Sequence, residues 1–465
     1  MFIPLLYSRR VTSTARIGDL PLGSGYPIRL QTMANTSTND IDGSVAQAQR
    51  CIEAGAEIVR FTTQGIREVE SLAKIHRLLA DAGSSCPLVA DVHFQADVAD
   101  AAAKVVEKVR INPGNYIDPA RKFKHIDYTE AEYQAELERL NSRFCRLLAI
   151  CKEHHTAIRL GVNHGSLSDR IMSRYGDTPA GMVESVMEFL RIAAREDFTD
   201  LVISVKASNT RIMVETVRLL VKQMDTEGMA FPLHLGVTEA GEGEDGRIKS
   251  AVGIGALLAD GMGDTIRVSL SEAPENEIPV ARALRDYFAA PQSIRYSYTR
   301  VEVIDDTVRY SNNETTWEAF QLEAAAECGR LLWDYDCKEL ILQNPHFSAE
   351  QREQLAKDIL QAARIRMYKT EYISCPGCGR TLFDLEKTIA EVKAATKHLK
   401  GLKIGIMGCI VNGPGEMADA DYGYVGAGRG RISLYRGKEC VLKNIPQEEA
   451  VEKLLELIQQ DQRFE

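Results

Sequence analysis

The sequence predicts an α/β protein with an N-terminal (β/α)8 barrel (a TIM barrel) and a smaller C-terminal α/β domain. Between residues 28 and 288, short β-branched or aliphatic runs alternate with longer stretches of helical periodicity. Eight such runs are present, and eight parallel strands separated by helices close into a barrel. Two cysteine-bearing loops beyond residue 371 indicate a separate unit.

Each predicted strand is short and apolar and precedes a helical stretch. We expect the strands at residues 28–33, 57–61, 88–92, 107–111, 157–160, 201–205, 233–237 and 264–268. The helical stretches lie at residues 43–54, 66–82, 128–155, 180–195, 209–224 and 247–259. The third of these is longer than a barrel needs, so we expect it to extend over the surface. A doubly wound sheet is the alternative, and the count of eight strands favours closure.

The composition changes at residue 291, where the barrel pattern ends. Residues 291–370 contain both tryptophans of the chain, and we interpret them as a short inserted or linking module. In this module Ser348 and Gln351 form a capping-box pattern that predicts the start of a helix. The remaining chain predicts a helix near 385–398, a strand at 403–407 and a last helix at 447–459. The expected domains are residues 1–290, 291–370 and 371–465.

Composition narrows the class of protein. The 465 residues carry a formal net charge of −10, which argues against a nucleic-acid partner and against an anionic membrane surface. No run approaches the ~18 apolar residues of a membrane helix. Ten cysteines without a secretory signal indicate a reducing compartment, so we expect the cytoplasm. Most of these cysteines are predicted to be small apolar residues: Cys51, Cys86, Cys145, Cys151, Cys328 and Cys337.

Five of the eight predicted strand ends carry a cation, although the whole chain is acidic. The active sites of barrels form at these ends. The cations are Arg60, Arg110, Arg159, Lys206 and Arg267, and Asn163 and Ser269 lie beside them in sequence. Five cations on one face would repel one another without an anion, so the pattern predicts a multiply charged substrate such as a diphosphate. For any one of them, an outward orientation or pairing with a carboxylate of the barrel is the alternative.

Two further strand ends carry acid–base candidates. Asp91 and His93 lie two residues apart, so both side chains share one face of a strand end and suit anion binding or proton transfer. A structural Asp–His pair is the alternative. Thr238 and Glu239 could supply an acid–base carboxylate, or Glu239 could neutralise a nearby arginine.

Three cysteines near the C-terminus can supply thiolates to a metal centre. Cys375 and Cys378 form a C-x-x-C pair, and Cys409 begins the segment CIVNGPGE. Soft thiolates select zinc or iron–sulfur clusters, and the spacing alone does not decide between them. In a [4Fe-4S] cluster, one iron would lack a thiolate and could take a substrate oxygen. Glu416 is the candidate fourth ligand, with Cys440 as its rival.

Six segments in this order resemble the 4-hydroxy-3-methylbut-2-enyl diphosphate synthase family of the non-mevalonate isoprenoid pathway. They are ADVHF, VRINPGN, RLGVNHGSL, GVTEAG, CPGCGR and GCIVNGPGE. The resemblance runs through about residues 1–290 and 372–460. It implies two-electron reductive ring opening and dehydroxylation of 2-C-methyl-D-erythritol 2,4-cyclodiphosphate, catalysed by a C-terminal [4Fe-4S] domain that closes over the barrel. It also implies ferredoxin or flavodoxin as the electron donor.

The resemblance assigns roles to individual residues. The cluster would be held by Cys375, Cys378, Cys409 and Glu416. The substrate would be bound by Arg60, Asp91, His93, Arg110, Arg159, Asn163, Lys206, Arg267 and Ser269, with Asn412 contacting it from the cluster side. Glu239 would donate a proton, with Thr238 beside it, and Glu416 would act at the open iron.

In two respects the sequence leaves alternatives open. The long helix after the fourth strand resembles the large form of the family, yet residues 291–370 look too short for its full insert, so we expect a shortened insert. A homodimer therefore stays possible, because in simple forms the cluster domain of one chain covers the barrel of the other. Two other functions compete: a non-redox phosphate-ester lyase or transferase with a structural zinc, and a cluster-based oxygen sensor.

Overall fold

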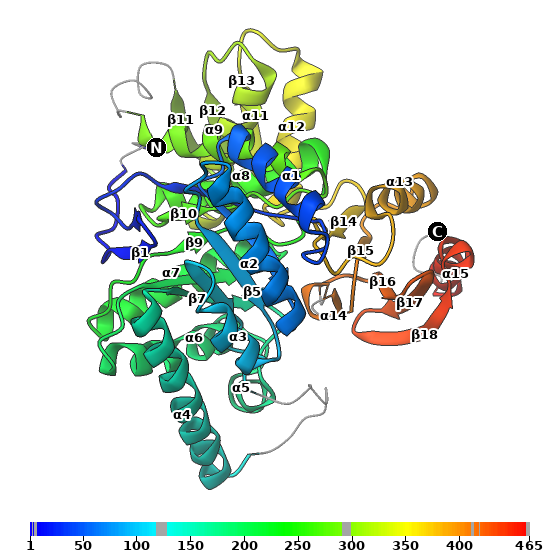
Figure 1. The fold of residues 1–465 in the computed structure, drawn as a ribbon. Helices are drawn as coiled ribbons and strands as arrows, with labels where there is room; N and C mark the ends of the chain where they lie inside the picture. Colours follow the sequence, from blue (N-terminus) through cyan, green and yellow to red (C-terminus); the bar gives the residue numbers. More distant parts are fainter. Residues whose placement is uncertain are drawn as a thin grey trace.

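A computed structural model describes residues 1, 3, 7–117, 128–290, 299–410, 413–417 and 419–461. Eight parallel strands form one sheet in the order β8-β7-β6-β5-β4-β3-β10-β9. A bridge between Ile203 and Leu233 joins the two ends of this order and closes the barrel (Figure 1). The strands are β3 (Arg29–Met33), β4 (Ile58–Thr63), β5 (Leu88–Val92), β6 (Lys108–Ile111), β7 (Ala157–Asn163), β8 (Leu201–Lys206), β9 (His234–Leu235) and β10 (Thr265–Ile266). The predicted barrel is confirmed.

Helices follow the strands and surround the barrel, most of them with one apolar face turned inwards, whereas the helix Gly243–Ala259 is buried almost all round. They are α1 (Ile41–Ala54), α2 (Ile66–Asp81), α3 (Ala96–Ala102), α4 (Glu130–His154), α5 (Asp169–Tyr175), α6 (Pro179–Arg195), α7 (Thr210–Thr226), α8 (Gly243–Ala259) and α9 (Glu277–Ala289), with a 3-10 turn η1 (Pro274–Asn276). The long helix α4 begins with a capping box at Thr129 and ends at His155, which has a left-handed backbone. No helix in the described ranges is both long and apolar enough to cross a membrane.

A hairpin that the sequence did not predict covers the bottom of the barrel. It consists of β1 (Ala15–Ile17) and β2 (Leu20–Leu22). Its apolar side chains pack against residues near the N-terminal ends of the barrel strands, such as Ile58 and Val202. Water is thereby kept from that end, and the opposite end is left for the site.

The inserted module packs on the barrel. It contains β11 (Arg300–Ile304), β12 (Thr307–Ser311), β13 (Glu339–Gln343), α11 (Trp317–Asp334) and α12 (Ala349–Ala362). The capping box predicted from Ser348 and Gln351 begins α12. The apolar residues of the module belong to the same buried cluster as the barrel core. The module is therefore built onto the barrel and lies outside the C-terminal domain.

Gly255 of α8 allows a close contact between the barrel and this module. A Cβ at this position would lie 2.5 Å from the Cβ of Ala326 in α11. We expect Gly255→Ala to lower the free energy of unfolding by about 1–3 kcal/mol, because two helix backbones would have to separate. Denaturant unfolding measures this change. Gly25→Ala is the control, since a Cβ there meets no atom within 4 Å; equal stabilities of the two variants would contradict the packing.

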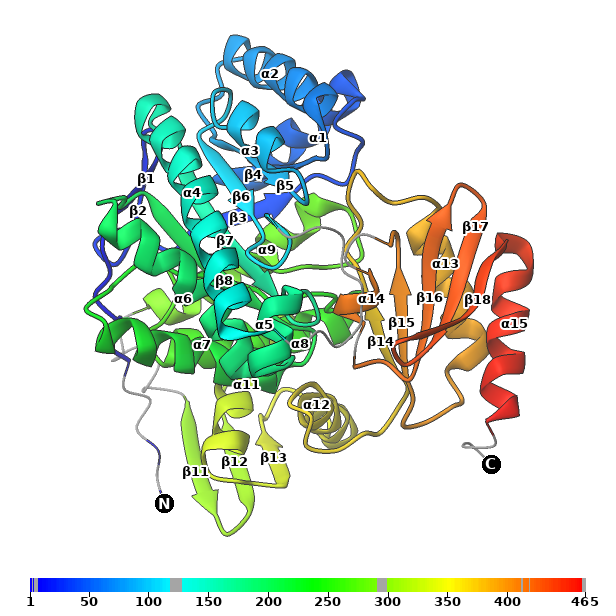
Figure 2. The same cartoon turned by 90° about the horizontal axis from the view of Figure 1, so that it is seen from below.

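The C-terminal domain has a core of its own, which includes Ile404, Tyr424 and Leu454. Its sheet has the order β14-β15-β16-β17-β18. The elements are β14 (Glu371–Ser374), β15 (Lys403–Met407), β16 (Tyr422–Gly428), β17 (Arg431–Arg436), β18 (Glu439–Pro446), α13 (Leu385–Thr396), α14 (Gly413–Glu416) and α15 (Gln447–Gln460). Figure 2 shows this domain beside the barrel, with α14 pointing towards it.

Candidate functional site

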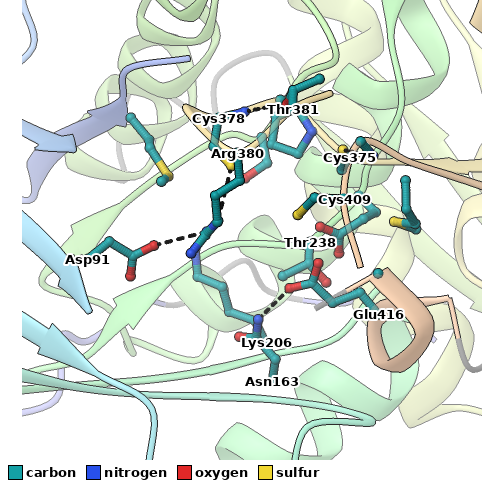
Figure 3. Close-up of a pocket in the computed structure, with 18 of the residues that line it drawn as sticks. Asp91, Asn163, Lys206, Thr238, Cys375, Cys378, Arg380, Thr381, Cys409 and Glu416 are labelled. Atoms are coloured by element: carbon teal, nitrogen blue, oxygen red, sulfur yellow. Dashed lines mark hydrogen bonds and ion pairs between the residues drawn. The ribbon is translucent and has the colours of Figure 1, made fainter. Parts of the chain in front are cut away.

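A pocket lies between the carboxyl ends of the barrel strands and the cysteine loops of the C-terminal domain (Figure 3). Both halves of the predicted site therefore meet within one chain. The lining residues from the barrel include Arg60, Asp91, Arg110, Arg159, Asn163, Lys206, Thr238, Glu239, Arg267 and Ser269. Those from the C-terminal domain include Cys375, Cys378, Arg380, Cys409 and Glu416.

The five predicted strand-end cations all line this pocket and are all buried. Burial, and then the charges of Arg159 and Arg60, holds the pKa of Lys206 well below its ordinary value. Burial also lowers the pKa of Arg60 to about 10, with contributions from Arg267 and Arg110. Each of these cations makes its neighbours less stable in the charged form, so a bound anion would stabilise them together.

Arg159 has two buried donors without a partner. The residue is 1% exposed, and its Nε and Nη1 atoms make no hydrogen bond. Arg267 differs, because its Nε and Nη2 atoms donate to Glu277 at 3.0 and 2.8 Å. Pairing with a carboxylate of the barrel, the alternative raised by the sequence, therefore applies to Arg267, and it applies also to Arg110, which pairs with Asp91.

Asp91 and Arg110 form a buried pair at the ends of β5 and β6. The Arg110 Nη1 atom donates to the Asp91 Oδ1 atom at 2.9 Å, and its Nη2 atom donates to the Gly161 carbonyl at 2.9 Å. A Cβ at Gly161 would lie 2.5 Å from the Arg110 Nε atom, which explains the first of the two glycines in RLGVNHGSL. His93 contacts the Arg110 side chain but does not itself line the pocket. Burial, and then the Arg110 charge, lowers the pKa of His93 to about 3, so its ring is neutral.

Two carboxyl groups meet where the domains touch. The Asn163 Nδ2 atom donates to the Glu416 Oε1 atom at 2.5 Å. Burial, and then the neighbouring Glu416, holds the pKa of Glu239 well above its ordinary value. The Glu239 Oε2 atom is buried without a hydrogen-bond partner, and the residue has a strained φ of 50°. Glu239 therefore presents a carboxyl group to the pocket beside Thr238.

The cysteine loops fit a cluster with three thiolates and one carboxylate. Cys375, Cys378, Cys409 and Glu416 line one pocket, and the Gly408 N–H group donates to the Cys375 Sγ atom at 3.2 Å. Across the described ranges, no three His, Cys, Asp or Glu side chains converge closely enough to hold a single metal ion. A four-iron cube is larger than one ion and takes ligands from a wider ring. The donor set of soft thiolates and one exchangeable carboxylate suits such a cube.

Glycine backbones make the contact between the two halves of the site. A Cβ at Gly165, after β7, would lie 2.1 Å from the Gly415 carbonyl oxygen, and one at Gly415 would lie 2.4 Å from the Gly165 oxygen. Ion pairs also join the two domains: Lys249 of α8 with Glu371 at 2.8 Å, and Lys393 with Glu242 at 2.8 Å. Polar contacts of this kind can open and close more readily than a shared apolar core.

Arg380 is a pocket residue that the sequence reasoning missed. It is the last residue of the motif CPGCGR, in which the sequence assigned a role only to the two cysteines. Asn412, predicted to contact the substrate, lies outside the described residues.

The fold and the site define a barrel protein in which a buried set of cations lies in one pocket with three cysteines of a second domain. Comparison with known families identifies it further. The GcpE TIM-barrel domain matches residues 12–282, and the GcpE protein C-terminal domain matches residues 371–460. The chain belongs to the GcpE family.

Curated relatives resemble the chain over nearly its whole length. A Bacteroides fragilis protein is 49% identical, covering 99% of this chain and 97% of its own, and one from Bacteroides thetaiotaomicron is 50% identical, covering 98% of each. A Leptospira interrogans protein is 38% identical, covering 99% and 98%. All three are named 4-hydroxy-3-methylbut-2-en-1-yl diphosphate synthase (flavodoxin). The first comparison spans 606 positions against the 465 residues here, so at least the difference, 141 positions, has no counterpart in this chain.

Proposed function

We propose that this chain converts 2-C-methyl-D-erythritol 2,4-cyclodiphosphate to (E)-4-hydroxy-3-methylbut-2-enyl diphosphate in isoprenoid biosynthesis, in a two-electron reduction that releases water. The names of the curated relatives bear out the synthase activity predicted from the sequence. The observation that carries the proposal is that buried cations of the barrel and three cysteines of the C-terminal domain line the same pocket. A polyanion and a redox centre can meet there.

We propose that Cys375, Cys378, Cys409 and Glu416 hold a [4Fe-4S] cluster. When bound, this group would supply the electrons for the reduction and a Lewis-acidic iron at the position that Glu416 holds. Cys440, the rival ligand considered from the sequence, lies in β18, where its Sγ atom contacts the Leu442 carbonyl at 3.8 Å. It is absent from the pocket lining, which favours Glu416 as the fourth ligand.

The residues of the barrel bind and orient the substrate. Arg60, Arg110, Arg159 and Lys206 grip the diphosphate and stabilise the negative charge that grows on it as the ring opens. The unmet donors of Arg159 are the strongest candidates for direct contact. Glu239, buried and with a free carboxyl oxygen, holds the proton that the departing hydroxyl group requires. Closure of the glycine contact excludes water from these steps.

The wider setting of the reaction is also a proposal. Flavodoxin, named for the relatives, is the electron donor that we favour over ferredoxin. The pocket forms within one chain, which supports closure of the cluster domain on its own barrel without a homodimer. The division at residues 290 and 370 stays a prediction, and the 141 or more unmatched positions support a shortened insert. A cytoplasmic location fits the use of free cysteines.

Anaerobic turnover tests this function. The iron-loaded protein is incubated with the cyclic diphosphate and dithionite, or with reduced flavodoxin, and the linear product is quantified. We expect product only with a reductant, with two electrons consumed per molecule. Product formation that is indifferent to reductant and lost in chelator would instead support the zinc-dependent lyase, and tight binding without turnover would support the oxygen sensor.

A further inference from the structure

Among the described residues of the C-terminal domain, Arg380 is the one cation that lines the pocket. It lies two residues beyond Cys378, on the loop that carries the first two cysteines. Its side chain is 8% exposed, so the charge is buried between the domains. A buried guanidinium group requires partners for its donors, and those partners indicate what it does.

The Arg380 side chain connects the cysteine loop to the barrel. Its Nε atom donates to the Cys378 Sγ atom at 3.4 Å, and its Nη2 atom donates to the Asp91 Oδ2 atom of β5 at 3.4 Å. Figure 3 shows the side chain reaching from the loop towards Asp91. Asp91 is 2% exposed and also accepts from Arg110, so one carboxylate aligns two guanidinium groups from different domains.

The third nitrogen of this group has no partner. The Arg380 Nη1 atom is buried and makes no hydrogen bond, although Nε and Nη2 do. Two fixed nitrogens of a planar group determine where the third one points. The Nε and Nη1 atoms of Arg159, which lines the same pocket, are also without partners. Buried donors without partners, contributed by both domains to one pocket, are the arrangement that an oxyanion would complete.

We propose that Arg380 is a substrate-binding residue that the cluster domain brings to the barrel, where its Nη1 atom donates to an oxygen of the diphosphate. This inference rests on the proposed function and adds a cation to the ring on the barrel. Because Nε binds the Cys378 sulfur, the same side chain fixes the distance between the bound diphosphate and the thiolate centre. Opening of the domains removes Arg380 from the site, so full affinity for substrate requires closure.

Binding of the cyclic diphosphate to Arg380→Gln tests the proposal. Titration calorimetry is performed on iron-loaded protein without reductant, so that no turnover occurs. We expect the Kd to rise at least about tenfold, as the loss of one charged hydrogen bond predicts. Lys387→Gln is the matched control, because this lysine lies on α13 of the same domain and is 72% exposed; its Kd should equal that of the wild type.

A second readout separates substrate binding from support of the loop. If Arg380 only held the cysteine loop, Arg380→Gln would lose iron, while iron-free variant and iron-free wild type would bind substrate equally. We expect the iron-free variant to bind more weakly as well. Arg380→Lys, which keeps the charge and lacks the fork, should raise the Kd by at least about threefold. A wild-type Kd in Arg380→Gln or in Arg380→Lys overturns the proposal. Failure of the proposed function would appear differently, as wild-type protein that does not reduce the substrate.

Discussion

Glu416→Ala is expected to lower kcat by at least about 100-fold while the substrate still binds. Loss of residues that only support metal ligands already costs about 10–100-fold, and Glu416 is proposed to be a ligand itself. The substitution also removes the acceptor of the Asn163 hydrogen bond between the domains. The cations of the barrel and Arg380 are all retained in this variant, so the Kd for the cyclic diphosphate should change far less than kcat. Anaerobic assays of kcat, together with calorimetry, measure both quantities.

The control for this prediction is Glu439→Ala. Glu439 is an exposed carboxylate at the start of β18, in the same domain. It should retain wild-type kcat and iron content. If Glu416→Ala also kept its kcat, Glu416 would be only a loop carboxylate, and the fourth position would need another occupant.

The second large effect is expected for Arg110→Ala, which should lower kcat/KM by about 100-fold or more. Charged hydrogen bonds to the diphosphate contribute about 1.5–3 kcal/mol, and they strengthen as negative charge develops on the leaving oxygen. We therefore expect KM to rise and kcat to fall. Removal of Arg110 also deprives buried Asp91 of its 2.9 Å partner. Steady-state kinetics under anaerobic conditions separate the two parameters.

Arg143→Ala provides the comparison for Arg110→Ala. Arg143 lies on helix α4, pairs with Asp97 and Asp100, and does not line the pocket. Its loss should leave both kinetic parameters unchanged. An unchanged KM in Arg110→Ala would remove Arg110 from the substrate site.

The barrel could be predicted from sequence because its signal is periodic and repeated. Strand-end cations were found because the carboxyl ends of all strands in a barrel face the same side, so linear position determines spatial position. The strands β9 and β10 are two residues long in the structure, shorter than predicted, and the chain leaves the sheet before it reaches Glu239 and Ser269. The β1–β2 hairpin was missed because three-residue strands carry almost no periodicity.

Individual side-chain roles were harder to predict because they depend on contacts between distant segments. His93 lies near a strand end, as Arg110 does. It contacts Arg110 but does not line the pocket. Arg380 belongs to a loop rather than a strand, and its partner Asp91 is 289 residues away. No spacing rule brings such residues together. The three cysteines could be proposed as ligands from the C-x-x-C pair and the segment that begins at Cys409, whereas Glu416 was chosen over Cys440 through the family resemblance.

The central claim is that a cluster with three thiolate ligands faces the cationic ring in one pocket, so that bound substrate reaches it. Electron paramagnetic resonance of the reduced, anaerobically prepared protein, recorded with and without the cyclic diphosphate, tests this most directly. We predict an iron–sulfur signal whose g values change when the substrate is added. A protein that takes up no iron, or a signal that stays the same at saturating substrate, would contradict it.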